Sequence, residues 1–374
     1  MIRLLPILFL IAACSSKQAE QNQPMAEQTQ PQVTVSIEPL QSYFESKIKP
    51  DEPGIAILVQ RNDTVLFKNG FGLADLQTKE PATPKTLFNL GSISKTFVAN
   101  GILILRQRGL LSLDDNMTQY FPGFQNKTIA NEVTIKHLLT HTSGLPDIRY
   151  PYRDSVFFLT AKDAENWAPV LKAKQLNFPS GSKFEYSNPA FNGLALIIES
   201  VSKTKWQNFI AQEIFKPAGM LTSTITDGAH PQSGVAHGYI QSKGEWLEKD
   251  YMEEPTFAAA GNGGVWSSVE ELALYYKALQ SATFLPREVV AESFEIKKFP
   301  NWADKTPEQI GWSWFVGKTD QGFTMIGHTG SQGGFRANFQ FVPEKQWLVI
   351  ILSSAPRPLE EYTNRMFDFL NTGK

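Results

Sequence analysis

Hydrophobic and polar residues alternate near both ends of the chain, and this pattern predicts β-strands there. At the N-terminal side, a helix is expected from Ser36, a suitable N-cap residue, to about Ile48. Residues 54–60 and 63–72 then have the pattern of two strands, with the polar pair Arg61-Asn62 between them. The spacing predicts a β-hairpin.

Four further strand-like runs follow one another near the end of the chain, at residues 310–318, 322–330, 334–343 and 346–354. Turn residues separate these runs, so we expect an antiparallel meander, which a helix over residues 358–370 follows. The region between, roughly 112–300, is mostly helices and long loops. Strands at both ends around a helical insertion predict an α+β fold, with one antiparallel sheet assembled from both ends and flanked by helices.

Composition and charge are those of a folded protein that does not bind nucleic acid. Of the 374 residues, 42% are hydrophobic and 19% are charged, which is typical of a globular domain. The formal net charge is −2 and no long basic stripe occurs, so nucleic acid is not an expected partner.

The first residues have the pattern of a secretion signal. An apolar stretch from Leu4 to Ile11 is too short to span a bilayer, and small residues lead from it to Cys14. Residues 11–14, Ile-Ala-Ala-Cys, resemble the lipobox of bacterial lipoproteins, in which the cysteine is lipidated. We therefore expect a signal peptide over 1–13, a Gln-rich flexible tether over 14–35 and one folded domain over 36–374.

The resemblance to a lipobox also predicts where in the cell the protein is located. By analogy with such lipoproteins, the serines at positions 15 and 16 favour the outer membrane, with the protein facing the periplasm. Cys14 is the only cysteine, so the chain has no internal disulfide and no cysteine nucleophile within the fold. A plain secretory signal with an incidental cysteine is the alternative.

Residues 92–105 have the apolar spacing of a helix, and Gly109 follows where a C-terminal cap is expected. Ser92 and Lys95 lie three positions apart and would share one face of its first turn. A serine hydroxyl is a weak nucleophile until a base takes its proton, and a neutral lysine amine can be that base. Burial and the positive end of the helix dipole would favour the neutral amine.

This pattern alone does not decide between a nucleophile and an ordinary helix cap. The same Ser-x-x-Lys spacing also begins at Ser46, Ser180, Ser200 and Ser202. The chain has no Gly-x-Ser-x-Gly motif, which makes an α/β-hydrolase an unfavoured alternative. His137 and His141 are four positions apart, but Leu138 replaces the glutamate of the metalloprotease motif His-Glu-x-x-His, so we expect structural roles for both histidines.

Two later motifs supply the context that Ser92 needs. Residues 186–188 are Tyr-Ser-Asn, and residues 328–330 are His-Thr-Gly. In this order, the three motifs resemble the serine β-lactamase and penicillin-binding protein superfamily, most nearly its class C β-lactamase-like group. Flanking stretches such as "TLFNLGSISKTF", "TIKHLLTHTSGLPD" and "AAGNGGVWSSVEELALY" extend the resemblance over most of residues 36–374.

The resemblance implies a five-stranded antiparallel sheet, an inserted mainly helical region and a site in the cleft between them. Ser92 would be the acylated nucleophile, and Lys95 and Tyr186 its base system, provided that positive charge lowers the pKa of Tyr186. The backbone N–H groups of Ser92 and Ser331 would form an oxyanion hole. The substrate-binding residues would be Asn188, His328, Thr329, Gly330 and Ser331.

One position departs from the β-lactamase pattern. Class C β-lactamases have Lys-Thr-Gly where this chain has His328 in first place, and a histidine is mostly neutral at pH 7. His-Thr-Gly resembles instead the peptidases and related hydrolases of the group. We therefore expect a serine hydrolase that acts through an acyl-enzyme, without metal or cofactor, on a small-molecule or peptide substrate.

The leading substrates are amide bonds of D-amino-acid or cell-wall-type peptides, followed by esters. A class C-type β-lactamase and a non-enzymatic β-lactam or muropeptide sensor remain alternatives. Selectivity is expected to depend on loops around residues 145–175 and 225–260, and Arg336 is a candidate for binding a substrate carboxylate, although strand alternation could equally direct it to solvent.

Overall fold

The computed structural model describes residues 37–147, 157, 160–225, 234–248, 258–305, 307 and 309–373. The expected signal peptide, Cys14, the tether and the cap residue Ser36 therefore lie outside the described residues. So do parts of both loops that were expected to govern selectivity. All described residues belong to one unit, Ser36–Lys374.

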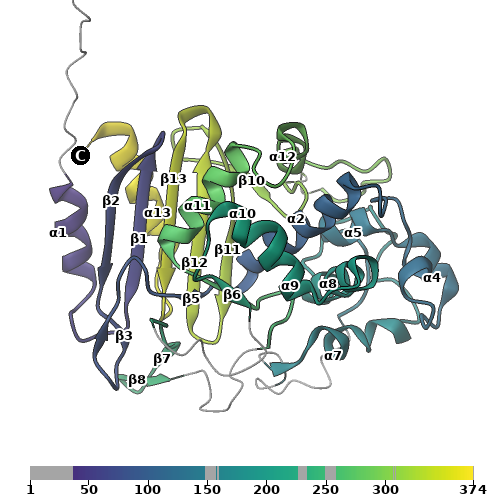
Figure 1. Ribbon diagram of the computed structural model, residues 1–374, viewed down its shortest axis with the longest axis horizontal. Helices are drawn as coiled ribbons and strands as arrows, with labels where there is room; N and C mark the ends of the chain where they lie inside the picture. Colours follow the sequence, from purple (N-terminus) through teal and green to yellow (C-terminus); the bar gives the residue numbers. More distant parts are fainter. Residues whose placement is uncertain are drawn as a thin grey trace, which may run out of the picture. The chain divides into compact units, whose positions relative to one another are not determined.

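An antiparallel sheet, whose strands come from both ends of the chain, forms one side of this unit (Figure 1). The predicted hairpin is present as β1 (Ile55–Arg61) and β2 (Thr64–Phe71), and the meander as β10 (Phe315–Lys318), β11 (Thr324–Gln332), β12 (Phe335–Val342) and β13 (Trp347–Ser353). The strand order is β10-β11-β12-β13-β1-β2, so the first and last strands of the chain meet at the β1–β13 pair. The prediction of one sheet built from both ends is confirmed.

The sheet has six strands in the described part of the chain, so the five implied by the resemblance was wrong. The extra strand is explained by counting the runs that the sequence itself shows, two in the hairpin and four in the meander. β10 is short and pairs only with residues 324–327 of β11. This short pairing leaves the second half of β11 with an open edge, which borders the site described below.

One face of the sheet is covered by the first and last helices, α1 (Glu38–Lys47) and α13 (Leu359–Thr372). Their aromatic side chains pack together, with Phe44 of α1 lying 5.5 Å from Tyr362 of α13 and 6.3 Å from Phe67 of β2, measured between ring centroids. The predicted helix is thus confirmed as Glu38–Lys47, but the expected N-cap at Ser36 was wrong, because Ile37 occupies that position.

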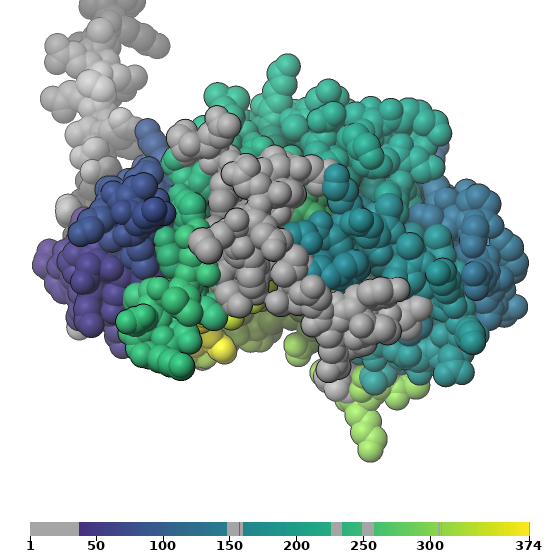
Figure 2. All heavy atoms as spheres, turned by 90° about the horizontal axis from the view of Figure 1, so that it is seen from below, coloured from purple at the N-terminus to yellow at the C-terminus, as the bar shows by residue number. Residues whose placement is uncertain are grey.

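The other face of the sheet carries α11 (Val269–Gln280), and the helical region extends beyond it (Figure 1). Figure 2 shows the same division in space-filling form, with the teal helical region on one side and the purple first strands on the other. Helix α2 (Ser94–Gln107) is buried throughout from Ser94 to Leu105 and packs against α8 (Asn188–Ser202). Because α2 is the central helix, the residues just before it are held between the sheet and the helical region.

The remaining described elements are short. The helices are α3 (Met117–Tyr120), α4 (Lys127–Glu132), α5 (Ile135–Leu139), α7 (Asp163–Trp167), α9 (Trp206–Ile210), α10 (Lys216–Ala218) and α12 (Arg287–Phe294). A π-helical turn covers Ala211–Phe215, and 3₁₀ turns cover Gly91–Ile93, Val170–Lys172 and Pro343–Lys345. The strands are β3 (Leu73–Asp75), β4 (Glu80–Pro81), β5 (Phe88–Asn89), β6 (Thr224–Ile225), β7 (Tyr239–Ser242), β8 (Glu245–Glu248) and β9 (Val265–Ser267).

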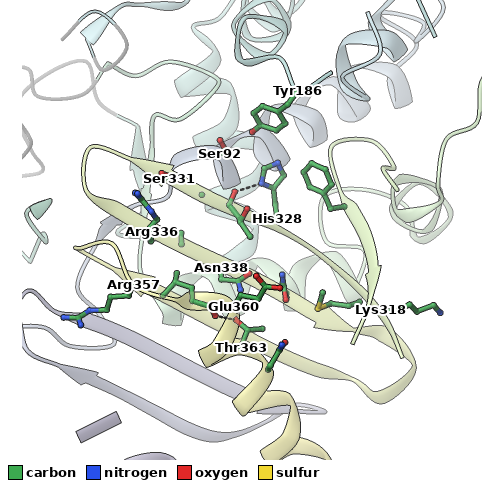
Figure 3. A pocket seen from close by; sticks show the side chains of 18 of the residues that line it. Ser92, Tyr186, Lys318, His328, Ser331, Arg336, Asn338, Arg357, Glu360 and Thr363 are labelled. Atoms are coloured by element: carbon green, nitrogen blue, oxygen red, sulfur yellow. Dashed lines mark hydrogen bonds between the residues drawn. The ribbon is translucent and has the colours of Figure 1, made fainter. Parts of the chain in front are cut away.

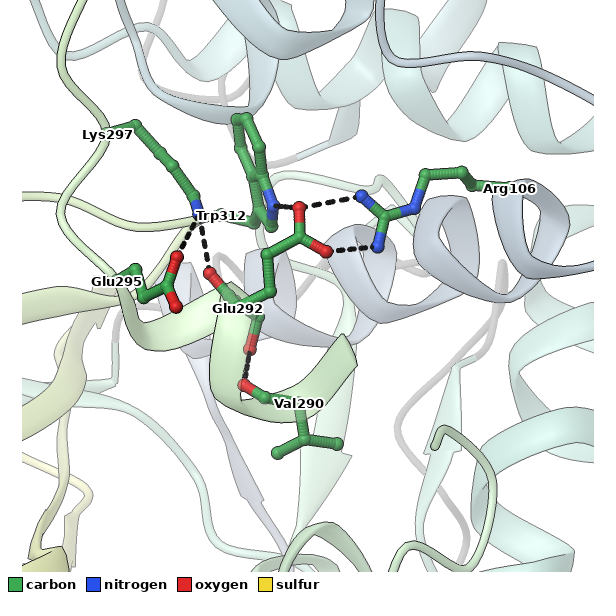
Figure 4. Close-up of polar contacts among 7 residues, drawn as sticks. Arg106, Val290, Glu292, Glu295, Lys297 and Trp312 are labelled. Atoms are coloured by element: carbon green, nitrogen blue, oxygen red, sulfur yellow. Dashed lines mark hydrogen bonds and ion pairs between the residues drawn. The ribbon is translucent and has the colours of Figure 1, made fainter. Parts of the chain in front are cut away.

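A polar cluster fixes the far end of α2 to α12 (Figure 4). The Arg106 guanidinium donates two hydrogen bonds to the Glu292 carboxylate, at 2.8 and 2.6 Å, and Trp312 Nε1 donates a third at 3.0 Å. These bonds hold the pKa of Glu292 below its usual range. The predicted helix end is confirmed as well, since Gly109 follows α2 with a φ of +69°. No helix in the described ranges is both long and apolar enough to cross a bilayer.

Candidate active site

Ser92 lies in the 3₁₀ turn Gly91–Ile93, immediately before α2. The prediction that the α-helix starts at Ser92 was therefore two residues early. The reason is local, because Gly91 has a φ of +50° and its N–H donates to Asn89 Oδ1 at 2.9 Å, which tightens the chain ahead of the helix. Ile93 occupies the N-cap position and no side chain caps this helix, so the alternative of Ser92 as an ordinary cap is excluded.

The Lys95 amine lies next to the Ser92 hydroxyl. Lys95 is fully buried, and its Nζ donates to Ser92 Oγ at 3.0 Å and to the Asn262 carbonyl at 2.7 Å. The Tyr186 hydroxyl lies close enough to Ser92 for the serine to lower its pKa, and Lys95 Nζ lies 5.1 Å from the centroid of the Tyr186 ring. The structure thus brings together the three residues that the motifs identified as nucleophile and base system.

The electrostatics of Tyr186 differ from the expectation. Burial of the phenol raises its pKa to about 12, and the hydrogen bond with Ser92 offsets this only in part. The condition under which Tyr186 could act as a base, a pKa lowered by positive charge, is not met, because desolvation is the largest effect at the hydroxyl although the residue as a whole is 39% exposed. Tyr186 is therefore a phenol, able to donate a proton, at neutral pH.

The His141 ring packs against the ring of Tyr186. The two rings stack with centroids 4.3 Å apart, and His141 Nδ1 accepts a hydrogen bond from Ser187 N at 3.0 Å. His141 is fully buried, which holds its pKa well below the usual value, so the ring is neutral. His137 Nδ1 accepts from Thr134 N at 3.2 Å at the start of α5. Both histidines make structural contacts, and the described residues contain no cluster of three or more metal-ligating side chains.

The open edge of β11 lies against the turn that carries Ser92. A Cβ placed on Gly330 would lie 1.9 Å from the Leu90 carbonyl oxygen and 3.3 Å from Ser92 N, so only glycine fits there. Likewise, a Cβ on Gly91 would lie 2.7 Å from Ser331 N. These approaches bring the backbone of residues 330–331 against that of residues 90–92, where the resemblance predicts the oxyanion hole.

His328 is 2% exposed and lines, from β11, the same cavity as Ser92. Its Nδ1 lies 2.6 Å from the Thr329 carbonyl oxygen, and its ring lies 6.5 Å from that of Tyr186. Burial, with the nearby Lys95 acting in the same direction, lowers the pKa of His328 to about 3. The histidine is therefore neutral at all physiological pH values and supplies no permanent charge.

A cavity of about 690 Å³ opens beside these residues (Figure 3). Ser92, Tyr186 and residues 328–331 line it, so most of the predicted binding residues are on its surface. Asn188 is not among its lining residues; it is half-buried at the first position of α8. From Ser331 the cavity continues over the α13 face of the sheet, past Arg336 and Asn338 to Glu360.

Sequence reasoning did not predict that residues 258–264 contact Lys95, or that the buried carboxyl of Asp163 is hydrogen-bonded to this segment. Asn262 accepts from Lys95 through its carbonyl and from Asn192 Nδ2 through its side chain at 3.0 Å. The same Asn192 Nδ2 donates to Asp163 Oδ1 at 2.8 Å, which also accepts from Gly261 N at 2.8 Å. Burial raises the pKa of Asp163 to about 7. The glycine-rich run around Asn262 was the only signal for this support in the sequence.

Comparison with known proteins agrees with this geometry. Residues 40–369 match the family described as Beta-lactamase. The chain belongs to the beta-lactamase family. This places it in the superfamily of serine hydrolases that includes penicillin-binding protein homologues, as the resemblance implied.

Individual relatives fit this membership. The chain is 28% identical to Penicillin-binding protein 4* of Bacillus subtilis over 79% of its length and 67% of that protein's. It is 26% identical to Protein flp of Staphylococcus aureus, of which it covers 62%, so the relatives extend beyond the matched region.

Solved structures show the same fold. An octameric penicillin-binding protein homologue from Pyrococcus abyssi superimposes with a TM-score of 0.78 at 27% identity, covering 91% of this chain and 78% of that one. A D-amino acid amidase from Ochrobactrum anthropi, solved with L-phenylalanine amide, gives 0.73 at 20% identity, covering 88% and 95%. The predicted α+β fold is thus confirmed.

Proposed function

We propose that the protein is a serine hydrolase of the class C β-lactamase-like group that cleaves amide bonds of D-amino-acid or cell-wall-type peptides. The observation that carries this proposal is the contact of Ser92 Oγ with both Lys95 Nζ and the Tyr186 hydroxyl. A nucleophile held between a base and an acid, beside paired backbone N–H donors, suits acyl transfer.

The proposed acylation step starts from the neutral Lys95 amine: Ser92 Oγ, 3.0 Å away, attacks the substrate carbonyl carbon and its proton passes to that amine. The carbonyl oxygen becomes an oxyanion between the N–H groups of Ser92 and Ser331. Tyr186, with its pKa raised to about 12, holds a proton at neutral pH and donates it to the leaving nitrogen as the amide bond breaks.

Water completes the proposed cycle. The Tyr186 phenolate left by acylation recovers its proton from the Lys95 ammonium, and the neutral Lys95 amine then takes a proton from the water molecule that attacks the acyl carbon, while the ester bond to Ser92 Oγ breaks. The proton held by Lys95 returns to Ser92 Oγ, so both proton carriers end in their starting states. Two low barriers thereby replace one high barrier.

The neutral state of His328 supports a peptidase over an efficient β-lactamase. A permanent cation in the first position of this triplet would attract the carboxylate of a β-lactam, and a histidine with a pKa of about 3 carries no charge to do so. The structural neighbours named as D-amino acid amidase and D-stereospecific amidohydrolase share the fold and agree with an amide substrate.

A substrate panel tests this proposal. p-Nitroanilides of D- and L-amino acids, p-nitrophenyl esters and nitrocefin are each incubated with the wild type and with Ser92→Ala. We expect turnover of D-configured amides by the wild type and none by the variant. Turnover of esters alone would replace the peptidase with an esterase, and efficient nitrocefin turnover would replace it with a β-lactamase.

We also propose that lipid on Cys14 anchors the protein to the outer membrane, where it faces the periplasm. The support is the sequence of residues 11–14. Cys14→Ala should move the protein from the membrane fraction to the soluble fraction, since each buried CH₂ of an acyl chain contributes about 0.8 kcal/mol to membrane binding. The activity of the purified domain should not change. Sedimentation of the variant with membranes would contradict the anchor.

A further inference from the structure

One buried carboxyl takes no part in the proposed reaction, yet hydrogen bonds connect it to Lys95. Asp163 is the first residue of α7 and is 6% exposed. Its Oδ1 accepts hydrogen bonds from Asn192 Nδ2 and from Gly261 N, each at 2.8 Å. Burying an acid is costly, and the pKa of Asp163, raised to about 7 by burial, reflects that cost. The two donors indicate what the buried acid does.

The orientation of Asn192 shows how its amide is used. Its Nδ2 donates to Asp163 Oδ1 and also, at 3.0 Å, to Asn262 Oδ1. Because Asp163 Oδ1 already accepts from Gly261 N, the amide turns its nitrogen and not its oxygen toward the acid. Asn192 Oδ1 is left buried, with no hydrogen-bond partner in the part of the chain that the structure describes. An unpaired buried acceptor is unfavourable, so the two bonds of Nδ2 are what fix this orientation.

Two consecutive carbonyls that follow Gly261 contact the catalytic residues. The Asn262 carbonyl accepts from Lys95 Nζ at 2.7 Å, and the Gly263 carbonyl accepts from Asn89 Nδ2 at 3.2 Å. Asn89 Oδ1 in turn accepts from the N–H of the first residue in the 3₁₀ turn that carries the nucleophile. The position of this short stretch of backbone therefore affects both the base and the nucleophile.

The same stretch has little rigidity of its own. Residues 261, 263 and 264 are glycines, so Asn262 carries the only side chain among residues 261–264. Only glycine fits at 261 and 264, because a Cβ at either position would lie within 2.7 Å of a backbone atom. A glycine-rich backbone loses the most conformational freedom when it is ordered. Hydrogen bonds from Asp163 on α7 and Asn192 on α8 supply the order that this stretch lacks.

We propose that Asp163 is a positioning residue for acylation, which fixes the Asn262 carbonyl and, through it, the Lys95 amine. The two hydrogen bonds accepted by Oδ1 do this, and the role does not depend on the charge of the carboxyl. The inference rests on the proposed serine hydrolase function and extends it to a residue that does not line the cavity. A misplacement of about 1 Å can cost about a hundredfold in rate, which sets the scale of the expected effect.

Single-turnover labelling of Ser92 with a fluorophosphonate tests the inference, with the rate constant measured from pH 5 to 10. Asp163→Ala removes both acceptor bonds, and Asn192→Ala removes the donor that connects the acid to Asn262. Each should lower the rate constant by roughly ten- to a hundredfold. Asn262→Ala removes a half-buried side chain and should lower it by about tenfold, which keeps the test open if a variant of a buried residue does not fold.

The pH profile separates positioning from a general loss of structure. Without the Asn262 carbonyl in place, a Lys95 ammonium loses an acceptor, so the pH of half-maximal rate should fall in all three variants. The titratable groups around this amine stay neutral over the range, because the pKa of Tyr186 is about 12, that of His328 is about 3, and burial holds the pKa of His141 well below its usual value. A variant that is only less stable would label to a lower extent, with the same rate constant and midpoint.

Two further variants complete the comparison. Asp163→Asn keeps an oxygen for both hydrogen bonds, so its rate constant and midpoint should stay close to those of the wild type. Asn100→Ala is the matched control, because Asn100 is a buried amide on α2 whose Nδ2 donates to the Tyr275 hydroxyl at 2.6 Å instead of serving this stretch. It should leave both values unchanged.

Three results would each overturn the positioning role while leaving the hydrolase in place. They are wild-type values in the three alanine variants that break the connection, a slower rate with an unchanged midpoint, and an Asp163→Asn protein as slow as Asp163→Ala. Failure of the wild type itself to label at Ser92 would instead contradict the proposed function.

Discussion

At the scale of single residues, burial decides how Tyr186 can act. Its hydroxyl lies beside Ser92, which lowers its pKa, yet desolvation is the larger effect and raises the pKa to about 12. A phenolate is therefore costly at neutral pH, so in the proposed mechanism the neutral Lys95 amine, 3.0 Å from Ser92 Oγ, receives the serine proton. The sequence motifs indicated both residues, and the structure places both beside Ser92, but the motifs could not show which is the acid and which the base, because that depends on solvent exclusion in the folded protein.

Tyr186→Phe removes one hydroxyl and should lower kcat by roughly two to four orders of magnitude, the usual effect of losing a positioned acid or base. Tyr362→Phe is the control, since Tyr362 lies in a second Tyr-x-Asn sequence on α13 and packs against Phe44. It should leave kcat unchanged. Steady-state kinetics of both purified variants measures this, and equal losses would mean that the catalytic tyrosine was assigned wrongly.

Other residues of the site could not be predicted from the sequence. Asn262 holds Lys95 through a backbone carbonyl, which any residue type possesses, so no letter in the sequence marks that contact. Asp163 lies 68 positions from Lys95 and reaches it only through Asn192 and Asn262. In contrast, Ser92 and Lys95 are three positions apart, and a local helical geometry alone suffices to bring them together.

At the scale of elements, the site depends on the close approach of β11 to the turn before α2. Gly330 and Gly91 make this approach possible, because a side chain at either position would meet backbone atoms of the other element. The hydrophobic pattern predicted both elements, but it could not show that they touch. The short pairing of β10 with β11 could not be predicted either, because the sequence shows a strand-like run but not how many of its residues pair.

Gly330→Ala should separate β11 from this turn, because the added methyl group would lie 1.9 Å from the Leu90 carbonyl oxygen. We expect a loss of at least about a hundredfold in the rate of Ser92 acylation, comparable to the removal of an oxyanion-hole donor. Stopped-flow or time-resolved labelling with a fluorophosphonate measures this rate.

Gly317→Ala is the matched control on the neighbouring strand, where the new methyl group would meet only Met325 Cε at 3.8 Å. Its acylation rate should stay close to that of the wild type. If Gly330→Ala acylated as fast as Gly317→Ala, the oxyanion hole would not lie between Ser92 and Ser331.

At the scale of the whole molecule, strands from both ends of the chain form one sheet, and Tyr186 from the helical insertion lines the cavity together with residues 328–331 of β11. The alternation of residues predicted this arrangement because strands with one buried face must pair and be covered. The number of strands was better predicted by counting runs than by family resemblance. The substrate was not predictable, since it depends on which charges meet in the cavity after folding.

The buried acid Asp163 should make the stability of the whole domain depend on pH. Its pKa rises from an ordinary 3.8 to about 7 in the folded protein, so between these values the folded state binds a proton that the unfolded chain has lost. The free energy of unfolding should therefore fall as pH rises from 5 to 8, by on the order of 3 kcal/mol from this group.

Asp163→Asn removes the titrating group and keeps an oxygen to accept from Asn192 and Gly261. Relative to the wild type, the variant should gain stability as pH rises from 5 to 8, whatever constant offset the substitution adds. Urea unfolding at both pH values measures the difference. Parallel pH profiles of the two proteins would show that Asp163 is ionised in the folded state.

The central claim is that Ser92, and no other serine, is the nucleophile. The most direct measurement is intact-mass spectrometry after treatment with a fluorophosphonate, applied to the wild type, Ser92→Ala, Ser46→Ala and Ser202→Ala. Ser46 donates to the Tyr43 carbonyl on α1, and Ser202 lies at the end of α8, so neither is placed for catalysis. One added label is predicted on the wild type and on both controls, and none on Ser92→Ala. A label on Ser92→Ala would contradict the claim.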